Sequence, residues 1–471
     1  MTGLPPLPYP ERRATALSRM ADGSMLLPAA DVRYKSGDSE YRYRPDSEML
    51  YVTGWEEGGS VAVLRGHAAK DRFVLFVPER DGERERWTGP RLDPGEVKAR
   101  FGADAVFPMT EFRSRAPALL ADGDRIHYRL GASAVCDDVV REALRAGRAR
   151  RARKGAGAYM VVDPGAVLDA MRVRKDAAEV ARLREAARIS VAAFREALGR
   201  VRPGAGEWEV EAALEAGFRR RGAGGPAFAT IVGAGANACT LHYTANRARI
   251  GSGDLVLMDA GAEFDYYAAD ITRTVPAWGR LEGARRDAYE IVREAHRAAL
   301  AACRPGGTLD DVHEAASRVI AGGLVGMGVV EGTVDEVLEG GAHRVFFPHK
   351  TSHWLGLDTH DVGAYWRAGY AGGAGAGGGG AGVSGGGGGA RRAGADGGGA
   401  SGPVELEPGM VFTVEPGLYF PPGSCNRVPE LDGTGIRIED DVLIGEDGAE
   451  VLTGELPVEL EELAPLIGAA S

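Results

Sequence analysis

The sequence predicts an amino-terminal α/β domain with a mixed sheet, residues 1–172, followed by a larger α+β domain, residues 173–471. Three observations support this division. Short β-rich runs alternate with helical segments in the first part, which is typical of an α/β domain. A strongly amphipathic helix begins at Lys175, just after a break in the pattern. Beyond it, the order of two helices and a hairpin occurs twice in outline, which hints at an internal duplication.

The amino-terminal part begins with a helix predicted over residues 11–20. Four apolar, β-rich runs then predict strands, and they cover residues 24–30, 49–55, 60–66 and 72–78. A strand over 125–130 and a helix over 137–147 follow. The basic run 148–154 has no interleaved aromatic residues, so a solvated helix face is favoured there over a nucleic-acid site.

The second part begins with the amphipathic helix 175–198, whose apolar residues recur at three- and four-residue steps. A breaker, Pro203–Gly204, separates it from a second helix. The remaining elements predicted in this part are a helix over 208–221, a strand over 227–232, helices over 283–303 and 309–322, and β-rich segments over 411–418 and 435–444.

A glycine-rich insert occupies residues 369–402. It has almost no apolar side chains beyond alanine, so burial cannot offset the entropy lost on ordering it. The composition therefore predicts a flexible loop. A passive insertion is favoured over a lid or contact role.

Charge and composition limit the partners. The formal charge of −11 argues against nucleic acid or an anionic membrane. No apolar run reaches the roughly 18 residues that would span a bilayer, and the amino terminus lacks the apolar segment of a secretory signal. The four cysteines lie far apart and form no CxxC pair, which fits reduced thiols. We therefore expect a cytoplasmic protein with no nucleic-acid or membrane partner.

The stretch 255–274 predicts two strands joined by a turn near residues 262–265, and each strand carries an aspartate, Asp259 and Asp270. Apolar neighbours flank both acids, so their carboxylates are expected to be at least partly buried. Buried, unpaired carboxylates are costly, and two that face each other also repel. A metal cation would resolve both problems.

Three of the nine histidines, His349, His353 and His360, fall within twelve positions. The first two would share a face if this segment were helical, but its threonine, tryptophan and glycine residues allow a loop or a strand equally well. A lone histidine is more often structural than catalytic. Three together, beside glycine and aspartate, favour a functional site.

Two later strands end in further polar groups. Glu415 shares a strand face with Val411 and Thr413, and Pro416 stops the strand directly after it. Read alone, it could face solvent. In the strand over 435–445, Arg437 and Glu439 share one face, and an ion pair facing water is the default interpretation of those two residues alone.

Four carboxylates and one imidazole form an oxygen-rich set, which suits two divalent cations better than one structural zinc. Four negative charges balance two such ions. Two ions would also lower the pKa of water enough for it to attack a carbonyl at neutral pH. The members of the set are Asp259, Asp270, His353, Glu415 and Glu439.

The segments that carry these residues resemble the metal-binding motifs of the aminopeptidase P family, among the pita-bread metallopeptidases. In order they are MDAGAEFDYYAADITRT, SHWLGLDTHDVG, TVEPGLY and GIRIEDD. Residues 39–54, SEYRYRPDSEMLYVTG, are similar to the amino-terminal domain of the bacterial members. The resemblance implies a pita-bread catalytic domain over 173–471 and removal of the N-terminal residue from Xaa-Pro peptides.

The resemblance also implies how the ligands divide. Asp259 would chelate one metal, His353 and Glu415 would bind the other, and Asp270 and Glu439 would bridge them. Manganese is the usual metal of the family, with cobalt, iron or zinc as substitutes. Glu415 would also accept a proton during catalysis, and the free amine of the substrate would lie near Asp270.

Further residues take roles by the same similarity. His242 would contact the substrate and the reaction intermediate, His360 would lie near the scissile carbonyl, and His349 would line the pocket that receives proline. Arg437 would hydrogen-bond the ligand network and contact the substrate. Trp87 resembles an aromatic residue that reaches a neighbouring subunit's site in tetrameric members, so a homo-oligomer, a dimer or a tetramer, is expected.

The sequence departs from the family pattern at Lys350, where many members carry glycine, and at the insert 369–402. Both bear on access and substrate preference. Prolidase, which shares the ligands but cleaves only Xaa-Pro dipeptides, is the nearest alternative. A non-catalytic pita-bread binding module is the alternative from another class, although such members typically lose metal ligands and this chain retains all five.

Overall fold

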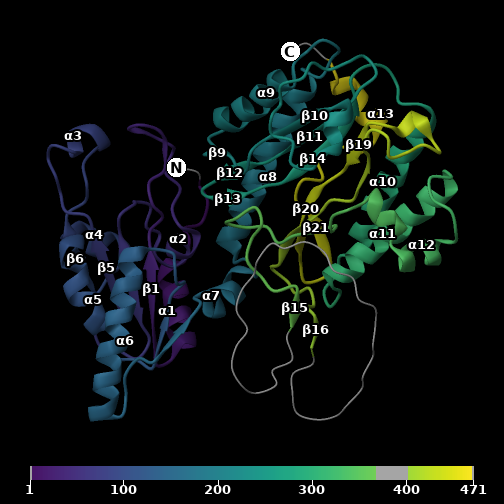
Figure 1. The fold of residues 1–471 in the computed structure, drawn as a ribbon. Helices are drawn as coiled ribbons and strands as arrows, with labels where there is room; N and C mark the ends of the chain where they lie inside the picture. The colour runs from purple at the N-terminus through teal and green to yellow at the C-terminus, as the bar shows by residue number, and fades with distance from the viewer. Residues whose placement is uncertain (1–2, 368–400, 469–471) are drawn as a thin grey trace, which may run out of the picture. The chain divides into compact units, whose positions relative to one another are not determined.

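The computed structural model describes residues 3–367 and 401–468, and within them the chain divides into two compact units (Figure 1). One unit comprises residues 6–171. The other begins at Arg172 and also contains residues 3–5. The predicted insert 369–402 lies outside the described residues, except for its last two positions.

The amino-terminal unit is built on a six-stranded sheet with the order β6-β5-β4-β1-β7-β8. Strand β1 pairs antiparallel with β4, and β4 with β5, while the other three pairings are parallel. The predicted mixed sheet is therefore confirmed. Its strands are β1 (Gly23–Pro28), β4 (Val61–Arg65), β5 (Phe73–Val77), β6 (Ala105–Pro108), β7 (Arg125–His127) and β8 (Met160–Val162), beside a small hairpin of β2 (Tyr34–Ser36) and β3 (Ser39–Glu40).

Two helices of this unit supply much of its apolar core. Side chains of α5 (Phe112–Leu120) and α6 (Ala134–Lys154) pack against the central strands. The basic run at the end of α6 is exposed apart from the half-buried Arg150, as expected for a solvated helix face. The other helices of the unit are α1 (Tyr9–Met20), α2 (Ser47–Thr53), α3 (Glu85–Thr88), α4 (Pro94–Phe101) and the 3₁₀ helix η1 (Met109–Glu111).

The strand predicted over residues 49–55 is wrong, because this segment is helix α2. The Asp46 side chain accepts a hydrogen bond from the Met49 N–H and caps the helix, and Gly54 ends it in a left-handed conformation with φ 71°. Every residue of α2 is buried, so the segment has no polar face to reveal the helical period.

The carboxy-terminal unit has two similar halves in its element order, each with a helix pair followed by strands. Figure 1 shows α8 and α9 beside β10, β11 and β14, and α10 and α11 beside the yellow strands. The helices of this unit are α8 (Ala177–Leu198), α9 (Glu207–Arg220), α10 (Gly283–Ala302), α11 (Leu309–Gly326), α12 (Val334–Gly340, not predicted) and α13 (Leu460–Leu463), with 3₁₀ helices η2 (Gly235–Cys239), η3 (Ala342–Val345), η4 (Pro429–Leu431) and η5 (Ala464–Leu466). Helix α7 (Gly165–Arg172) belongs to the amino-terminal unit, except for its last residue.

The strands of this unit form short sheets rather than one large sheet. Three strands make the order β10-β11-β14, three make β17-β20-β21, three make β13-β12-β9, and two further pairs are β18-β19 and β15-β16. Their bounds are β9 (Gly225–Pro226), β10 (Ile231–Ala234), β11 (Leu255–Ala260), β12 (Ala262–Phe264), β13 (Tyr267–Ala268), β14 (Ile271–Pro276), β15 (Trp366–Arg367), β16 (Gly402–Pro403), β17 (Val411–Val414), β18 (Gly417–Phe420), β19 (Thr434–Arg437), β20 (Asp440–Ile444) and β21 (Ala449–Val451).

Each half has its own apolar core. One core joins α8 and α9 to β10, β11 and β14, and the other joins α10 and α11 to β17 through β20. A bridge between Thr272 and Glu439 connects the two halves directly. Among the described residues, every helix is too short or too polar to span a membrane.

Candidate metal centre

The predicted hairpin over 255–274 forms, and its turn lies at the end of the predicted range. Strand β11 pairs antiparallel with β14, which sets Asp259 opposite Thr272. The chain then continues as the short pair β12 and β13, and it turns at Asp265 and Tyr266, which both have positive φ angles, 48° and 70°. The turn therefore lies at the last residue of the predicted range 262–265 and the residue after it, because the hairpin extends beyond Gly261 as a second, smaller sheet.

Gly261 lies where the two strands approach most closely. A Cβ atom at this position would stand 1.6 Å from the Ala269 carbonyl oxygen and 3.0 Å from the Asp270 nitrogen. We expect Gly261→Ala to lower the free energy of unfolding by about 3 kcal/mol. The atoms that the new Cβ would overlap belong to the main chain, so no side chain can rotate away to relieve the clash. Urea denaturation measures this. Gly253→Ala, at a glycine with open space around it, is the matched control and should change stability little.

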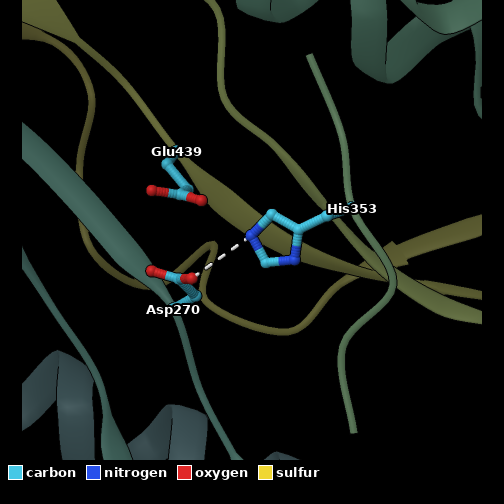
Figure 2. A group of neighbouring side chains, drawn as sticks. All are labelled: Asp270, His353 and Glu439. Carbon is cyan, nitrogen blue, oxygen red and sulfur yellow. Dashed lines mark ion pairs between the residues drawn. The ribbon is translucent and has the colours of Figure 1, made fainter. Parts of the chain in front are cut away.

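Three side chains from three separate segments of the chain converge beyond this hairpin. Asp270, His353 and Glu439 each present a ligand atom, and these atoms lie within 4.8 Å of one another. Figure 2 shows the His353 ring directed between the two carboxylates, with its Nε2 atom 3.5 Å from Asp270 Oδ2. A shared position for a cation is therefore available between them.

The histidine ring is oriented for ligation. His353 Nδ1 lies 3.0 Å from the Trp354 carbonyl oxygen, which can only accept, so Nδ1 carries the proton. Nε2 is then left with a free lone pair, as metal-binding histidines require. Glu415 Oε1 lies 3.7 Å from the same Nε2 atom. The segment that holds His349 and His353 is a loop, so of the alternatives left open by the sequence the helix is excluded.

The electrostatics of the cluster favour a cation. Burial, followed by repulsion from Glu439 and Asp259, raises the pKa of Asp270 well above its ordinary value. Burial and repulsion from Glu415 likewise raise the pKa of Glu439. Two buried oxygens, Asp259 Oδ1 and Asp270 Oδ1, find no hydrogen-bond partner among the described residues. Oxygen-rich donors with orphaned lone pairs fit divalent metal ions.

Arg437 is buried inside the cluster and does not face water. Its Nη2 atom donates to Asp259 Oδ2 at 2.5 Å, and its Nε atom donates to Thr272 Oγ1 at 3.0 Å. Thr272 in turn donates to Glu439 Oε2 at 2.6 Å. The ion pair facing water, which Arg437 and Glu439 suggest when read alone, is therefore excluded, since both side chains are buried.

A tyrosine that the sequence reasoning did not single out extends this network. Arg437 Nη1 donates to the Tyr419 hydroxyl at 2.8 Å, and that hydroxyl lies 2.9 Å from His349 Nε2. His349 Nδ1 lies 2.8 Å from the Lys350 carbonyl oxygen, so Nδ1 is protonated and Nε2 accepts from Tyr419. An unbroken chain of hydrogen bonds thus runs from Asp259 to His349.

The two acidic residues that follow Glu439, Asp440 and Asp441, hold the main chain around the cluster in place through hydrogen bonds and an ion pair. Asp441 accepts the Asp270 N–H at 3.1 Å, and Arg273 donates to the Glu439 carbonyl oxygen at 2.6 Å. Arg273 also pairs with Asp440 at 2.8 Å. Burial alone would raise the pKa of Asp440, but Arg273 and His296 outweigh it and hold that pKa below its ordinary value. Both oxygens of the Asp440 carboxylate have partners, Oδ1 in Arg273 and Oδ2 in His296 at 3.1 Å, so Asp440 anchors Arg273.

His360 lies against His353, with the two ring centroids 4.3 Å apart. Burial and the nearby His353 lower its pKa. The next residue, Asp361, is buried and forms ion pairs with Arg172 at 2.6 Å and Lys175 at 3.1 Å. This three-residue group, Arg172, Lys175 and Asp361, is called the aspartate clamp below.

The remaining sequence-predicted residues lie around this centre or apart from it. His242 is exposed in the loop after η2. It is close enough to His360 to contribute to the lowering of the His360 pKa. Lys350 is exposed, with its Nζ atom 4.0 Å from Asp310. Trp87 belongs to the other unit, on α3, and is 87% exposed.

Comparison with known protein families identifies the family to which this chain belongs. The model of metallopeptidase family M24 matches residues 181–446, and that of the aminopeptidase P N-terminal domain matches residues 9–127. The chain belongs to metallopeptidase family M24. The resemblance drawn from the four motifs is confirmed, and so is the pita-bread fold that it implied.

Relatives of this M24 metallopeptidase align along nearly its whole length. An Xaa-Pro aminopeptidase of Escherichia coli K12 is 37% identical, with 98% of each chain covered. Aminopeptidase PepP of Pseudomonas aeruginosa has a TM-score of 0.88 at 39% identity and covers 100% of this chain and 99% of its own. A zinc-substituted E. coli aminopeptidase P in complex with product has a TM-score of 0.86 at 36% identity and covers 98% of both chains.

Proposed function

We propose that this metallopeptidase releases the N-terminal residue from peptides with proline in the second position. The observation that carries the proposal is the convergence of Asp270, His353 and Glu439, with Glu415 beside them, in a chain whose full-length relatives are Xaa-Pro aminopeptidases. Neither prolidase nor a non-catalytic module is favoured by these comparisons.

We assign the ligands as the motifs suggest. Asp259 would chelate one divalent ion, His353 and Glu415 would hold the other, and Asp270 and Glu439 would bridge them. The orphaned oxygens of Asp259 and Asp270 support this division. Manganese is the proposed metal, with cobalt, iron or zinc as substitutes. When bound, the two ions supply Lewis acidity and lower the pKa of water enough for attack on a carbonyl.

The protein's own groups then have separate tasks. Glu415 accepts the proton of the attacking water and returns it to the proline nitrogen as the carbon–nitrogen bond breaks. His242 and His360 donate hydrogen bonds to the carbonyl oxygen as negative charge develops on it. His349, held by Tyr419, lines the pocket for the proline ring. Arg437 holds Asp259 in place through a hydrogen bond and contacts the substrate. Asp270 lies near the substrate amine.

Three further proposals concern the whole chain. We propose domains at 1–172 and 173–471, consistent with the division into units near Arg172. We propose a homo-oligomer, a dimer or a tetramer, in which the exposed Trp87 reaches a neighbouring subunit. A cytoplasmic location fits the four free cysteines, three of which are buried.

Peptide hydrolysis with and without metal tests the function. We expect an Xaa-Pro-Xaa tripeptide to be cleaved, activity to disappear after chelation, and added Mn²⁺ to restore it, because the carboxylate cluster has no other source of Lewis acidity. Glu415→Ala should stay inactive with Mn²⁺. Activity confined to an Xaa-Pro dipeptide would establish prolidase instead, and absence of bound metal together with absence of activity would favour a binding module.

A further inference from the structure

His242 lies in a segment that has no helix or strand of its own. Residues 240–248 form turns and irregular chain between η2 and β11, and the His242 side chain is exposed. No ladder of main-chain hydrogen bonds can therefore fix its position. Whatever holds this histidine near the centre must act through the residues on either side of it.

A buried glutamate on α9 accepts hydrogen bonds from residues on both sides of His242. Glu207 is fully buried, with 0% of its surface exposed. Its Oε1 atom accepts the Ala234 N–H and an Asn237 Nδ2–H, both at 2.9 Å. Its Oε2 atom accepts the Tyr243 hydroxyl at 2.9 Å and the Ala248 N–H at 2.8 Å.

These four donors match the acceptor capacity of an ionised carboxylate, which has two oxygens and no proton to give. Two of the donors are main-chain groups on opposite sides of His242, one at the end of β10 and one at the end of the irregular segment. The third is the side chain directly after His242. Strand β10 pairs with β11, so Glu207 ties the His242 segment to the strand that carries Asp259.

The residues that flank His242 are also packed against the metal-bearing strands. Leu241 and Tyr243 contact a small apolar cluster that includes Leu257 and Tyr419. Leu257 is two residues before Asp259 on β11, and Tyr419 is the hydroxyl donor to His349. The hydrogen bonds to Glu207 therefore hold in place a segment that also packs against the strands of the candidate metal centre.

We propose that Glu207 is a positioning residue for His242. It acts by accepting hydrogen bonds on both sides of the histidine, and it contacts neither substrate nor metal. The inference rests on the proposed role of His242 in stabilising the reaction intermediate. It predicts that disturbing Glu207 changes the chemical step while metal affinity stays the same.

The test compares Glu207→Gln with a matched buried glutamate. In Glu207→Gln an amide NH₂ replaces one acceptor oxygen, so in either orientation a main-chain N–H loses its acceptor. We expect kcat to fall by roughly 100-fold with KM within about twofold, since a misplacement near 1 Å has that effect. Glu179→Gln is the control, because Glu179 is also buried and accepts a tyrosine hydroxyl, from Tyr267, at 3.0 Å. It should keep its kcat.

Tyr243→Phe removes a single donor and provides a milder variant in case Glu207→Gln does not fold. We expect it to lower kcat about fivefold. Titration with Mn²⁺ by calorimetry should give unchanged affinity for both variants. A loss of Mn²⁺ affinity, or a Glu207→Gln or Tyr243→Phe enzyme with undiminished kcat, would overturn the positioning role.

A double-mutant cycle separates this inference from the proposed function. If Glu207 acts through His242, the double variant Glu207→Gln/His242→Ala should be no slower than His242→Ala alone. Additive losses would show that Glu207 works by another route. If His242→Ala itself keeps full activity, the assigned role of His242 fails, and the positioning role fails with it.

Discussion

Asp270→Asn is expected to abolish peptide hydrolysis and at the same time to stabilise the metal-free protein. The carboxylate of Asp270 is buried among other acids, so its charged form is disfavoured by desolvation and by repulsion from Glu439 and Asp259. Asparagine has nearly the same shape and no charge. A group whose folded-state pKa is raised lowers stability at any pH where it is ionised in the unfolded chain, so removal of this charge is expected to raise the free energy of unfolding at neutral pH.

The same substitution removes a proposed metal ligand. Loss of residues that merely support a metal ligand weakens affinity or activity about 10- to 100-fold, so loss of a ligand should cost at least about 100-fold in kcat/KM. Urea denaturation of the chelated protein and calorimetry with Mn²⁺ measure the two effects. A metal-free Asp270→Asn protein that is less stable than the original would contradict the electrostatic account of the cluster, and one that binds Mn²⁺ normally would contradict the ligand assignment.

Asp361→Ala is expected to lower the free energy of unfolding by about 3–5 kcal/mol, because it leaves two buried cations of the aspartate clamp without their shared partner. The side chains of Arg172 and Asp361 are only 2% and 1% exposed. Burial alone would lower the pKa of Arg172, but the neighbouring Asp361 and Asp358 outweigh it and raise that pKa. The guanidinium therefore stays charged and needs an anion.

Asp358→Ala is the matched control for the aspartate clamp. Asp358 pairs with the same Arg172 nitrogen at 2.7 Å, but its side chain is 36% exposed. Solvent-exposed pairs contribute about 0–1 kcal/mol, so the control should remain close to the original in urea denaturation. Equal losses for the two variants would mean that burial of Asp361 is not the source of the effect. Peptidase activity should also fall in Asp361→Ala and not in Asp358→Ala, because His360 directly precedes Asp361.

Local sequence patterns predicted the architecture well where an element shows two faces. Helix α8 has a clear apolar stripe, and Asp176 caps it with a capping box, so its bounds followed closely from the sequence. Helix α2 was read as a strand because all of its residues are buried. The close approach of the two strands at Gly261 leaves no periodic signal in the sequence, so the smaller sheet beyond it was not predicted.

The candidate ligands could be found from sequence because acids and histidines on apolar strands are conspicuous in number and surroundings. Their supports could not. Tyr419 looks like an ordinary strand residue until Arg437 and His349 are seen beside it. Glu207 reads as a helix-start glutamate, and its four donors become visible only when the loop around His242 has folded onto it. Long-range partners leave no local signature.

The bond between Thr272 and Glu439 joins residues 167 positions apart in the chain. Contacts of such long sequence separation form late, because the loop entropy is lost before the contact is gained. While the chain is still emerging or only half collapsed, one half of the ligand set is present without the other. We therefore expect no peptide hydrolysis from a nascent chain until both halves of the proposed ligand set have come together.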